Sequence, residues 1–241
     1  VSGVLSGEGG DEVFAGYDRF KASKLNRAYT TLPRPLREKL VAPLLLSFKD
    51  RPQKKGAINM LKRFIEGSLL PEEAEQIRWQ FFLSQDLSDN LFSDAFRSDV
   101  AFDPFGPLRD CRARCSTRDR VNAELYTDTR FVMVDSVLMK VDKMSMASAL
   151  EVRVPFLDHR LLEMAARIPG SLKLKGMETK HIFRKALEGY LPHDIVYRGK
   201  QGYSLPVKHL LRTQLKDYMT ELLMESPVVR ENMNVDYVQT Q

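Results

Sequence analysis

Three carboxylates and four glycines are packed into one short stretch near the start of the chain. Residues 5–17 read Leu-Ser-Gly-Glu-Gly-Gly-Asp-Glu-Val-Phe-Ala-Gly-Tyr. Glycine lets backbone N–H groups come close to a ligand, because it has no Cβ and adopts positive φ at little cost. The stretch therefore indicates a nucleotide-binding turn.

Within this turn, Glu8 and Asp11 are the groups that could take part in chemistry. A carboxylate beside bound phosphates is unfavourable unless a metal ion or a nucleophile requires it, so Glu8 is a candidate catalytic residue. Asp11 could hold Mg²⁺, which prefers one or two carboxylates together with substrate phosphates and water. The alternative is that Asp11 and Glu12 only cap the helix that follows.

A second glycine-punctuated loop, residues 198–203, carries two cations, Arg198 and Lys200. Cations in such a turn suit a polyphosphate leaving group, on which negative charge develops as the phosphoanhydride bond breaks. The residues alone favour the simpler interpretation of solvated surface cations.

Other charged and thiol groups give weaker signals. Asp135 and Asp142 lie seven residues apart on one helical face, which could point into a cleft or only into solvent. Basic clusters at 49–55 and 109–120 contain acids and no alternating aromatics, so they resemble an ordinary charged surface more than an RNA site. Cys111 and Cys115 are badly placed for a disulfide or a zinc site, and we expect them to be structural or incidental thiols.

The elements that must position these groups are one short strand and many helices. Residues 1–5 predict a short buried strand that runs into the glycine turn, as in α/β folds that bind ligands at the carboxyl ends of their strands. Asp158 follows Pro155 and predicts a helix N-cap. Val134, Leu138, Val141 and Met144 predict one buried stripe on a long helix over 127–150. Further helices are predicted over 36–48, 57–68, 72–83, 87–96, 179–191 and 207–224.

Composition is that of a soluble globular protein, with 43% hydrophobic residues in 241 and a net charge of +5. No stretch approaches the ~20 apolar residues of a membrane-spanning helix, so we expect no membrane partner. The scarcity of cysteine fits a reducing cytoplasm, where we expect the protein to be located. A nucleic-acid partner is not required by so small an excess of positive charge. Because the chain begins with Val1, we expect it to be part of a longer protein.

Four blocks of the sequence, in this order, resemble the synthetase domain of glutamine-hydrolysing asparagine synthetases. They comprise residues 5–17, residues 138–147 (Leu-Met-Lys-Val-Asp-Lys-Met-Ser-Met-Ala), residues 151–159 (Glu-Val-Arg-Val-Pro-Phe-Leu-Asp-His) and the loop at 198–206. The resemblance covers most of residues 1–215. It implies a C-terminal, mainly α part of an α/β ATP-pyrophosphatase fold (adenine nucleotide alpha hydrolase-like), with a short N-terminal strand.

The resemblance also implies a reaction. ATP and Mg²⁺ would activate the side-chain carboxylate of aspartate as an acyl-adenylate, with release of pyrophosphate. Ammonia from a glutaminase domain would then give asparagine and AMP. Carried over by position, Ser6 and Gly7 would contact the nucleotide, Glu8 would serve formation and aminolysis of the adenylate, Asp11 would bind Mg²⁺, and Lys200 would stabilise phosphate charge. Tyr17 would line the pocket or belong to the core.

Departures from the family pattern are equally informative. Residues 1–241 contain no Ser-Gly-Gly-x-Asp-Ser pyrophosphate loop and no glutaminase domain. We therefore expect a partial synthetase domain over 1–241 that does not catalyse the reaction alone. Three alternatives remain open: an amidotransferase with another carboxylate acceptor, a tRNA-modifying adenylase, and a noncatalytic helical module. A homodimer is also an open alternative.

Overall fold

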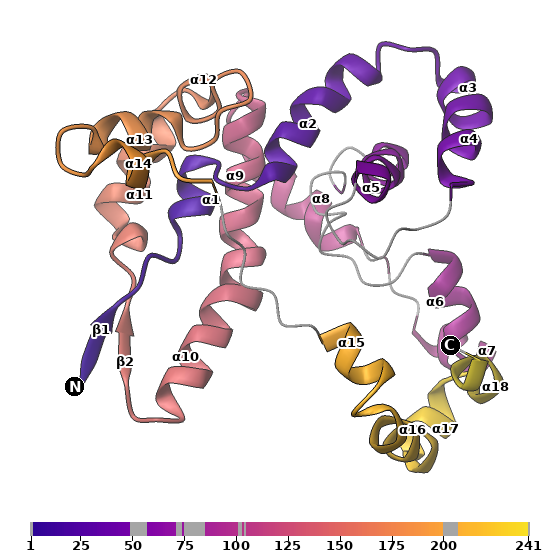
Figure 1. The fold of residues 1–241 in the computed structure, drawn as a ribbon. Coiled ribbons are helices and arrows are strands. Elements are labelled where there is room, and N and C mark those ends of the chain that lie inside the picture. Colours follow the sequence, from indigo (N-terminus) through magenta and orange to yellow (C-terminus); the bar gives the residue numbers. More distant parts are fainter. Residues whose placement is uncertain are drawn as a thin grey trace. The chain divides into compact units, whose positions relative to one another are not determined.

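The structure is a computed structural model, and it describes residues 2–48, 57–70, 74, 85–100, 103, 105–199 and 207–240. The chain divides into two compact units. The larger unit is made of residues 1–80 and 105–197, and the smaller unit of residues 81–104 and 198–241. Figure 1 shows that helices dominate both units, as the sequence predicted.

Two short parallel strands form the sheet of the larger unit. β1 (Gly3–Leu5) pairs with β2 (Glu151–Arg153), with Val4 opposite Val152 and Leu5 opposite Arg153. The predicted strand is confirmed, but its predicted burial is wrong: Leu5 is 75% exposed. The physical reason is that, among the described residues, β1 has a neighbour on one side only, which leaves its other edge open.

Most helices of the larger unit are short. They follow the chain in two groups, before and after the segment 81–104 that belongs to the smaller unit. The first group is α1 (Gly10–Phe14), α2 (Asp18–Tyr29), α3 (Arg34–Leu36), η1 (Arg37–Val41), α4 (Ala42–Leu46) and α5 (Ala57–Leu69). The second is α8 (Gly106–Ala113), α9 (Arg120–Arg130), η3 (Val132–Leu138), α10 (Met139–Met146), η4 (Pro155–Leu157), α11 (His159–Arg167), α12 (Gly170–Lys173), α13 (His181–Leu187) and α14 (His193–Val196).

The predicted long helix over 127–150 is in fact three segments, because residues Val132–Leu138 form a π-helix, η3, between α9 and α10. A π-helical turn hydrogen-bonds from i to i+5, so residues at α-helical spacing no longer share a face. The predicted buried stripe is therefore wrong. Val134 and Met144 are exposed, while Met133 is buried.

Other predicted boundaries also shift. The helix over 36–48 is present as α3, η1 and α4, with π-helical backbone at Arg37–Val41. The helix over 179–191 is shorter, because α13 starts at His181 and its C-cap is Glu188. The helix over 57–68 is confirmed as α5, whereas that over 72–83 lies outside the described residues except for Ala74.

Two apolar clusters form the core of the larger unit. One joins Ala15 and Phe20 to Leu125 and Leu174, and Tyr17 and Val121 pack against it. The other joins Val13 and Phe14 of α1 to Ala165 of α11. Both clusters use residues that directly follow the glycine turn, so this turn is anchored in the core at its C-terminal end.

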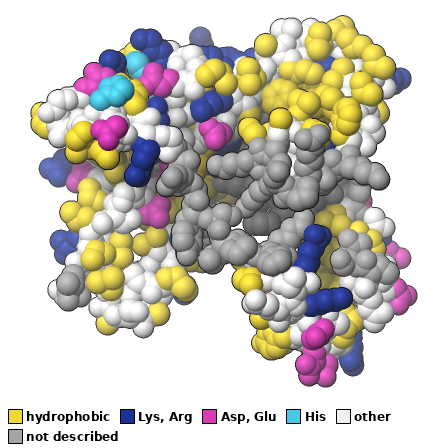
Figure 2. All heavy atoms as spheres, viewed as in Figure 1, with side chains coloured by type: hydrophobic (Ala, Val, Ile, Leu, Met, Phe, Trp, Pro, Cys, Tyr) yellow, Lys and Arg dark blue, Asp and Glu magenta, His cyan; other side chains and the backbone are white. Residues whose placement is uncertain are grey.

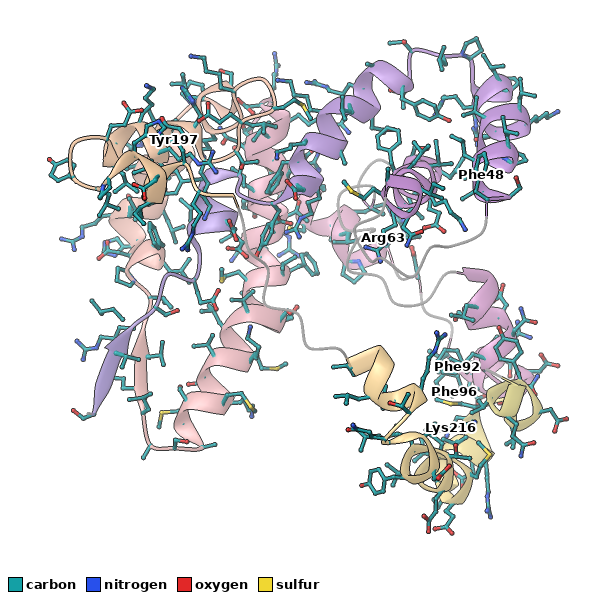
Figure 3. The ribbon with its side chains drawn as sticks, in the orientation of Figure 1. Phe48, Arg63, Phe92, Phe96, Tyr197 and Lys216 are labelled. Carbon is teal, nitrogen blue, oxygen red and sulfur yellow. The ribbon has the colours of Figure 1, made fainter. Side chains whose placement is uncertain are left out.

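The smaller unit combines α6 (Gln85–Leu91) and α7 (Asp94–Asp99) with α15 (Val207–Arg212), α16 (Lys216–Glu225), α17 (Pro227–Asn232) and α18 (Val235–Thr240). Figure 3 labels Phe92 and Phe96, whose rings stack with centroids 5.0 Å apart. The predicted helix over 87–96 is interrupted because Ser93 accepts a hydrogen bond from the Phe96 backbone N and thereby starts α7. The predicted helix over 207–224 is likewise split between α15 and α16.

The helices of the described part of the chain include none with the length and apolar character that crossing a bilayer requires.

Candidate active site

The candidate site begins where the two parallel strands end. Beyond β1, the Ser6 backbone N donates to the Arg153 carbonyl oxygen at 2.8 Å, which extends the pairing by one step. The carboxyl ends of parallel strands lie at one edge of a sheet, and this edge is where α/β folds bind ligands. The first and third sequence blocks, residues 5–17 and 151–159, therefore meet at this edge.

The glycine turn itself is held tightly at Gly9 and is open at Gly7. Gly9 has a φ of +91°, and a Cβ there would lie 2.6 Å from Leu157 Cδ2. A side chain is thus excluded by both conformation and space. A Cβ on Gly7 would meet no atom within 4 Å. The open side of the turn is the side on which a ligand can approach the backbone.

Glu8 lies between these two glycines and is half-buried. Its backbone N lies 3.4 Å from Ser6 Oγ. Among the described residues, its carboxylate has no hydrogen-bonding or ion-pair partner. A carboxylate that is neither buried in the core nor used in an ion pair remains available to act on a substrate.

Asp11, in the first turn of α1, pairs with a residue that sequence reasoning did not select. Lys180 Nζ lies 2.8 Å from Asp11 Oδ1, and both side chains are about three-quarters buried. Lys180 has a φ of +54°, in the left-handed region that is uncommon for residues other than glycine. Non-glycine residues in this region are concentrated at functional sites.

Gly16 makes room for this ion pair. A Cβ at Gly16 would lie 1.9 Å from Asp11 Oδ1 and 2.3 Å from Lys180 Cε. The Gly16 backbone N also donates to the Asp11 carbonyl oxygen at 2.8 Å. The glycine at the end of the motif thus has a packing role distinct from that of Gly9.

Three phenylalanines fix α1 against the elements that carry the other groups. Phe14 stacks on Phe183 of α13 with centroids 5.1 Å apart, and Phe156 of η4 packs edge-on against both rings. Such aromatic pairs contribute roughly 0.5–1.5 kcal/mol beyond their buried area. They hold α13, and with it Lys180, beside the glycine turn.

Glu12, which is buried, and Tyr17, which is partly buried, form a polar pair next to the turn. The Tyr17 hydroxyl donates to the Glu12 carboxylate, and the Glu12 side chain is 1% exposed. Burial raises the pKa of Tyr17 well above its usual value, and the bond to Glu12 raises it further. Tyr17 therefore stays protonated, and its ring packs on the core cluster of Phe20 and Leu125.

The remaining predicted groups have varied outcomes. Lys200 lies outside the described residues. Asp135 and Asp142 are both exposed, as the simpler interpretation expected. Cys111 and Cys115 are free thiols, which agrees with their predicted role. Asp158 caps α11 by accepting a hydrogen bond from the Arg160 backbone N at 2.9 Å, as predicted.

Lys180 could have been found from its position. The sequence predicts a helix start at residue 179 or 180, and a cation is unfavourable there because the helix dipole places positive charge at that end. A lysine in such a place needs a compensating carboxylate, and the structure shows that Asp11 supplies it.

Metal binding would depend on few protein groups. No cluster of three or more His, Cys, Asp or Glu side chains suited to a metal ion occurs among the described residues. Magnesium in nucleotide sites is usually held by one or two carboxylates, substrate phosphates and water. The Asp11 carboxylate, which is 23% exposed, fits that mode of binding.

The structure thus defines a mainly helical unit in which a glycine-rich turn, at the carboxyl end of a parallel strand, carries a half-buried glutamate, and a lysine–aspartate pair lies between α1 and the start of α13. The asparagine synthase family matches residues 1–240, and the chain belongs to this family.

Individual relatives include two asparagine synthetases and an amidase. The chain is 31% identical to asparagine synthetase [glutamine-hydrolyzing] 1 of Bacillus subtilis, over 94% of this chain and 34% of that relative. It is 34% identical to a putative asparagine synthetase [glutamine-hydrolyzing] of Mycobacterium bovis, over 88% of this chain and 31% of the relative. It is 27% identical to amidase chyE of Penicillium rubens, over 92% of this chain and 35% of the relative. The chain thus spans about a third of the length of these relatives. No solved structure matches it significantly.

Proposed function

We propose that residues 1–241 are part of a synthetase domain that forms an amide from a carboxylate, ATP and glutamine-derived ammonia, with aspartate as the acceptor. The single observation that supports this most strongly is Glu8, whose carboxylate is unpaired among the described residues in an open glycine turn at a strand end. The family membership and the names of the relatives point to the same chemistry.

In the first step, a carboxylate oxygen of aspartate attacks the α-phosphorus of ATP, and pyrophosphate leaves. Ser6 and Gly7 bind the nucleotide through the open side of the turn. Lys180 lies beside Asp11 and stabilises negative charge on the departing phosphates. Lys200 stays a prediction for the same role. The pyrophosphate loop of the family would come from residues outside 1–241.

In the second step, ammonia attacks the acyl carbon of the adenylate, and AMP leaves. The attacking nitrogen must lose a proton, and the Glu8 carboxylate is the available base in the turn. Glu12 does not fill this role, because it is buried and accepts the Tyr17 hydroxyl.

Asp11 would hold Mg²⁺ together with the nucleotide phosphates. When bound, this ion supplies positive charge that offsets the phosphate charge. Lys180 then has a second function, because its ammonium group keeps the Asp11 carboxylate oriented toward the site.

Replacement of Glu8 tests the proposal in the natural protein at full length. Glu8→Gln keeps the size of the side chain and removes its charge. We expect steady-state, aspartate-dependent pyrophosphate release to fall by at least about 100-fold, the usual contribution of a general base, because an adenylate that is not aminolysed blocks the next turnover. Glutaminase activity measured separately should be unchanged.

Glu163→Gln is a matched control, because Glu163 is an exposed residue of α11 outside the turn. It should leave both activities unchanged. Undiminished pyrophosphate release by Glu8→Gln would remove Glu8 from the reaction and contradict the proposal.

A second candidate is a related amidotransferase that activates a different carboxylate. It is favoured by the similarity to amidase chyE, which extends over 92% of this chain. Pyrophosphate release measured with aspartate and with other carboxylic acids, under the same conditions, distinguishes the two candidates. Release that depends on another acid and not on aspartate would select the second.

A further inference from the structure

A pocket of about 300 Å³ lies in the larger unit, between α2, the start of α9 and α12. None of the residues that line it belongs to the glycine turn or to the Asp11–Lys180 pair. The lining contains four cationic side chains and two carboxylates. The cations are Lys24, Arg27, Arg118 and Arg120, and the carboxylates are Asp119 and Glu124.

The two carboxylates are already engaged by protein donors. Asp119 accepts from the backbone N of Asn122 at 3.1 Å and from that of Gly170 at 2.7 Å. Glu124 accepts from the Ser23 hydroxyl and from Arg120 Nε. Their negative charge is therefore directed into the wall and away from the pocket space.

The cations are engaged to a smaller extent. Within the described part of the chain, the guanidinium groups of Arg27 and Arg118 have no hydrogen-bonding or ion-pair partner. Lys24 donates one of its protons to the Gly176 carbonyl oxygen at 2.9 Å. The lining consequently has a net charge of +2 at neutral pH, and its unused donors are available to an anion. Figure 2 shows Lys and Arg side chains close to α12 and the first turn of α9.

The uncharged part of the lining comprises two serines, Ser23 and Ser171, and three apolar residues. Phe20 and Leu174 belong to the core cluster, and Val121 packs against it. A rigid apolar wall beside guanidinium groups suits a ligand that has both an anionic and a hydrophobic part. A volume of about 300 Å³ is at the small end of ligand sites, so the ligand would be a small molecule.

We propose that this pocket binds a small organic phosphate monoester, with the phosphate between Arg27 and Arg118 and the apolar part against Val121 and Leu174. A phosphate is favoured over a carboxylate because it has three oxygens and up to two negative charges. Two guanidinium groups from different elements, α2 and the segment before α9, can each bind a different oxygen pair. This site is separate from the proposed adenylation site.

Titration calorimetry of phenyl phosphate binding to the natural full-length protein tests the proposal. Phenyl phosphate has the required phosphate and a hydrophobic ring, and benzoate serves as the carboxylate of similar shape. We expect phenyl phosphate to bind to the wild type, and to bind at least about tenfold more tightly than benzoate. Arg27→Ala and Arg118→Ala should each weaken binding about tenfold or more.

Both arginines are exposed, so their replacement leaves the core intact. Arg167→Ala, an exposed arginine on α11, is the matched control and should leave the affinity unchanged. Lys180→Ala alters the proposed adenylation site, and it should also leave the affinity for phenyl phosphate unchanged. Absence of binding at 10 mM phenyl phosphate, about the weakest affinity of interest, would overturn the proposal. Equal affinity for benzoate would also overturn it. So would an affinity that changes in Lys180→Ala and not in Arg27→Ala. Loss of the adenylation activity in Glu8→Gln does not bear on any of these measurements.

Discussion

Arg19 and Asp128 are 109 residues apart in the sequence, yet Arg19 Nη2 lies 2.6 Å from Asp128 Oδ2 in the core between α2 and α9. The Asp128 side chain is fully buried, and the Arg19 guanidinium also lies 4.0 Å from the centre of the Tyr17 ring. This pair connects the segment after the glycine turn to α9, the helix that contributes Leu125 to the core.

Removal of one partner should therefore lower the free energy of unfolding far more than removal of both partners. Arg19→Met leaves the buried Asp128 carboxylate without the cation of Arg19. We expect the free energy of unfolding to fall by about 3–5 kcal/mol. The double variant Arg19→Met with Asp128→Leu should recover a large part of that loss, since neither charge of this pair is then buried. Urea unfolding of the wild type, both single variants and the double variant measures the coupling. Glu38→Ala, which breaks an exposed pair with Arg34, should leave the transition unchanged.

Gly16 allows a sharp test of the Asp11–Lys180 pair. Gly16→Ala places a methyl group within 1.9 Å of Asp11 Oδ1, so the carboxylate must move. A displacement of about 1 Å in a catalytic group can lower turnover about 100-fold, and we expect a loss of that order in pyrophosphate release. Gly3→Ala is the control, because its methyl group would meet only the Glu151 carbonyl oxygen at 3.6 Å. Full activity in Gly16→Ala would show that the pair has no role in the reaction.

Lys173 should make stability depend on pH. Its side chain is 2% exposed, and burial lowers its pKa to about 8 from an ordinary 10.5. Between these values the unfolded chain binds more protons than the folded chain, so the free energy of unfolding should rise as pH increases from 8 toward 10.5. Below pH 8 the cost of burying the charge is present in full.

Urea unfolding at several pH values from 8 to 9.5 measures this rise, whose slope is at most about 1.4 kcal/mol per pH unit for one group. The range stops below 10 because the raised pKa of Tyr17 has the opposite effect above that value. In Lys173→Met the rise in the free energy of unfolding with pH that Lys173 causes should disappear. Lys175 is an exposed neighbour, so this rise should persist in Lys175→Met. An unchanged slope in Lys173→Met would assign the pH dependence to another group.

Local chemistry explains which parts of the structure could be predicted from the sequence. The strand before the glycine turn and the Asp158 cap depend on residues within a few positions of one another, and both are confirmed. The closeness of Ser6, Glu8 and Asp11 follows from their adjacency in the sequence alone.

Features that depend on distant contacts could not be predicted in this way. The stripe containing Val134 and Met144 fails because the π-helical backbone of η3 changes the face that each residue occupies. The residue types of that segment do not indicate a π-helix. The position of Lys180 at a helix start is visible in the sequence, but its pairing with Asp11 is not, since the packing of Phe14 on Phe183 brings the two segments together.

The pairing of β1 with β2 has a consequence during protein synthesis. The motif that contains Glu8 leaves the ribosome before its partner strand, which is encoded roughly 150 residues later. At about 5–20 residues per second, the glycine turn waits about 8–30 s for the strand that completes it. During that interval Val4 and Leu5 lack β2, the strand with which they pair in the folded structure, so this side of the glycine turn is completed only late in synthesis.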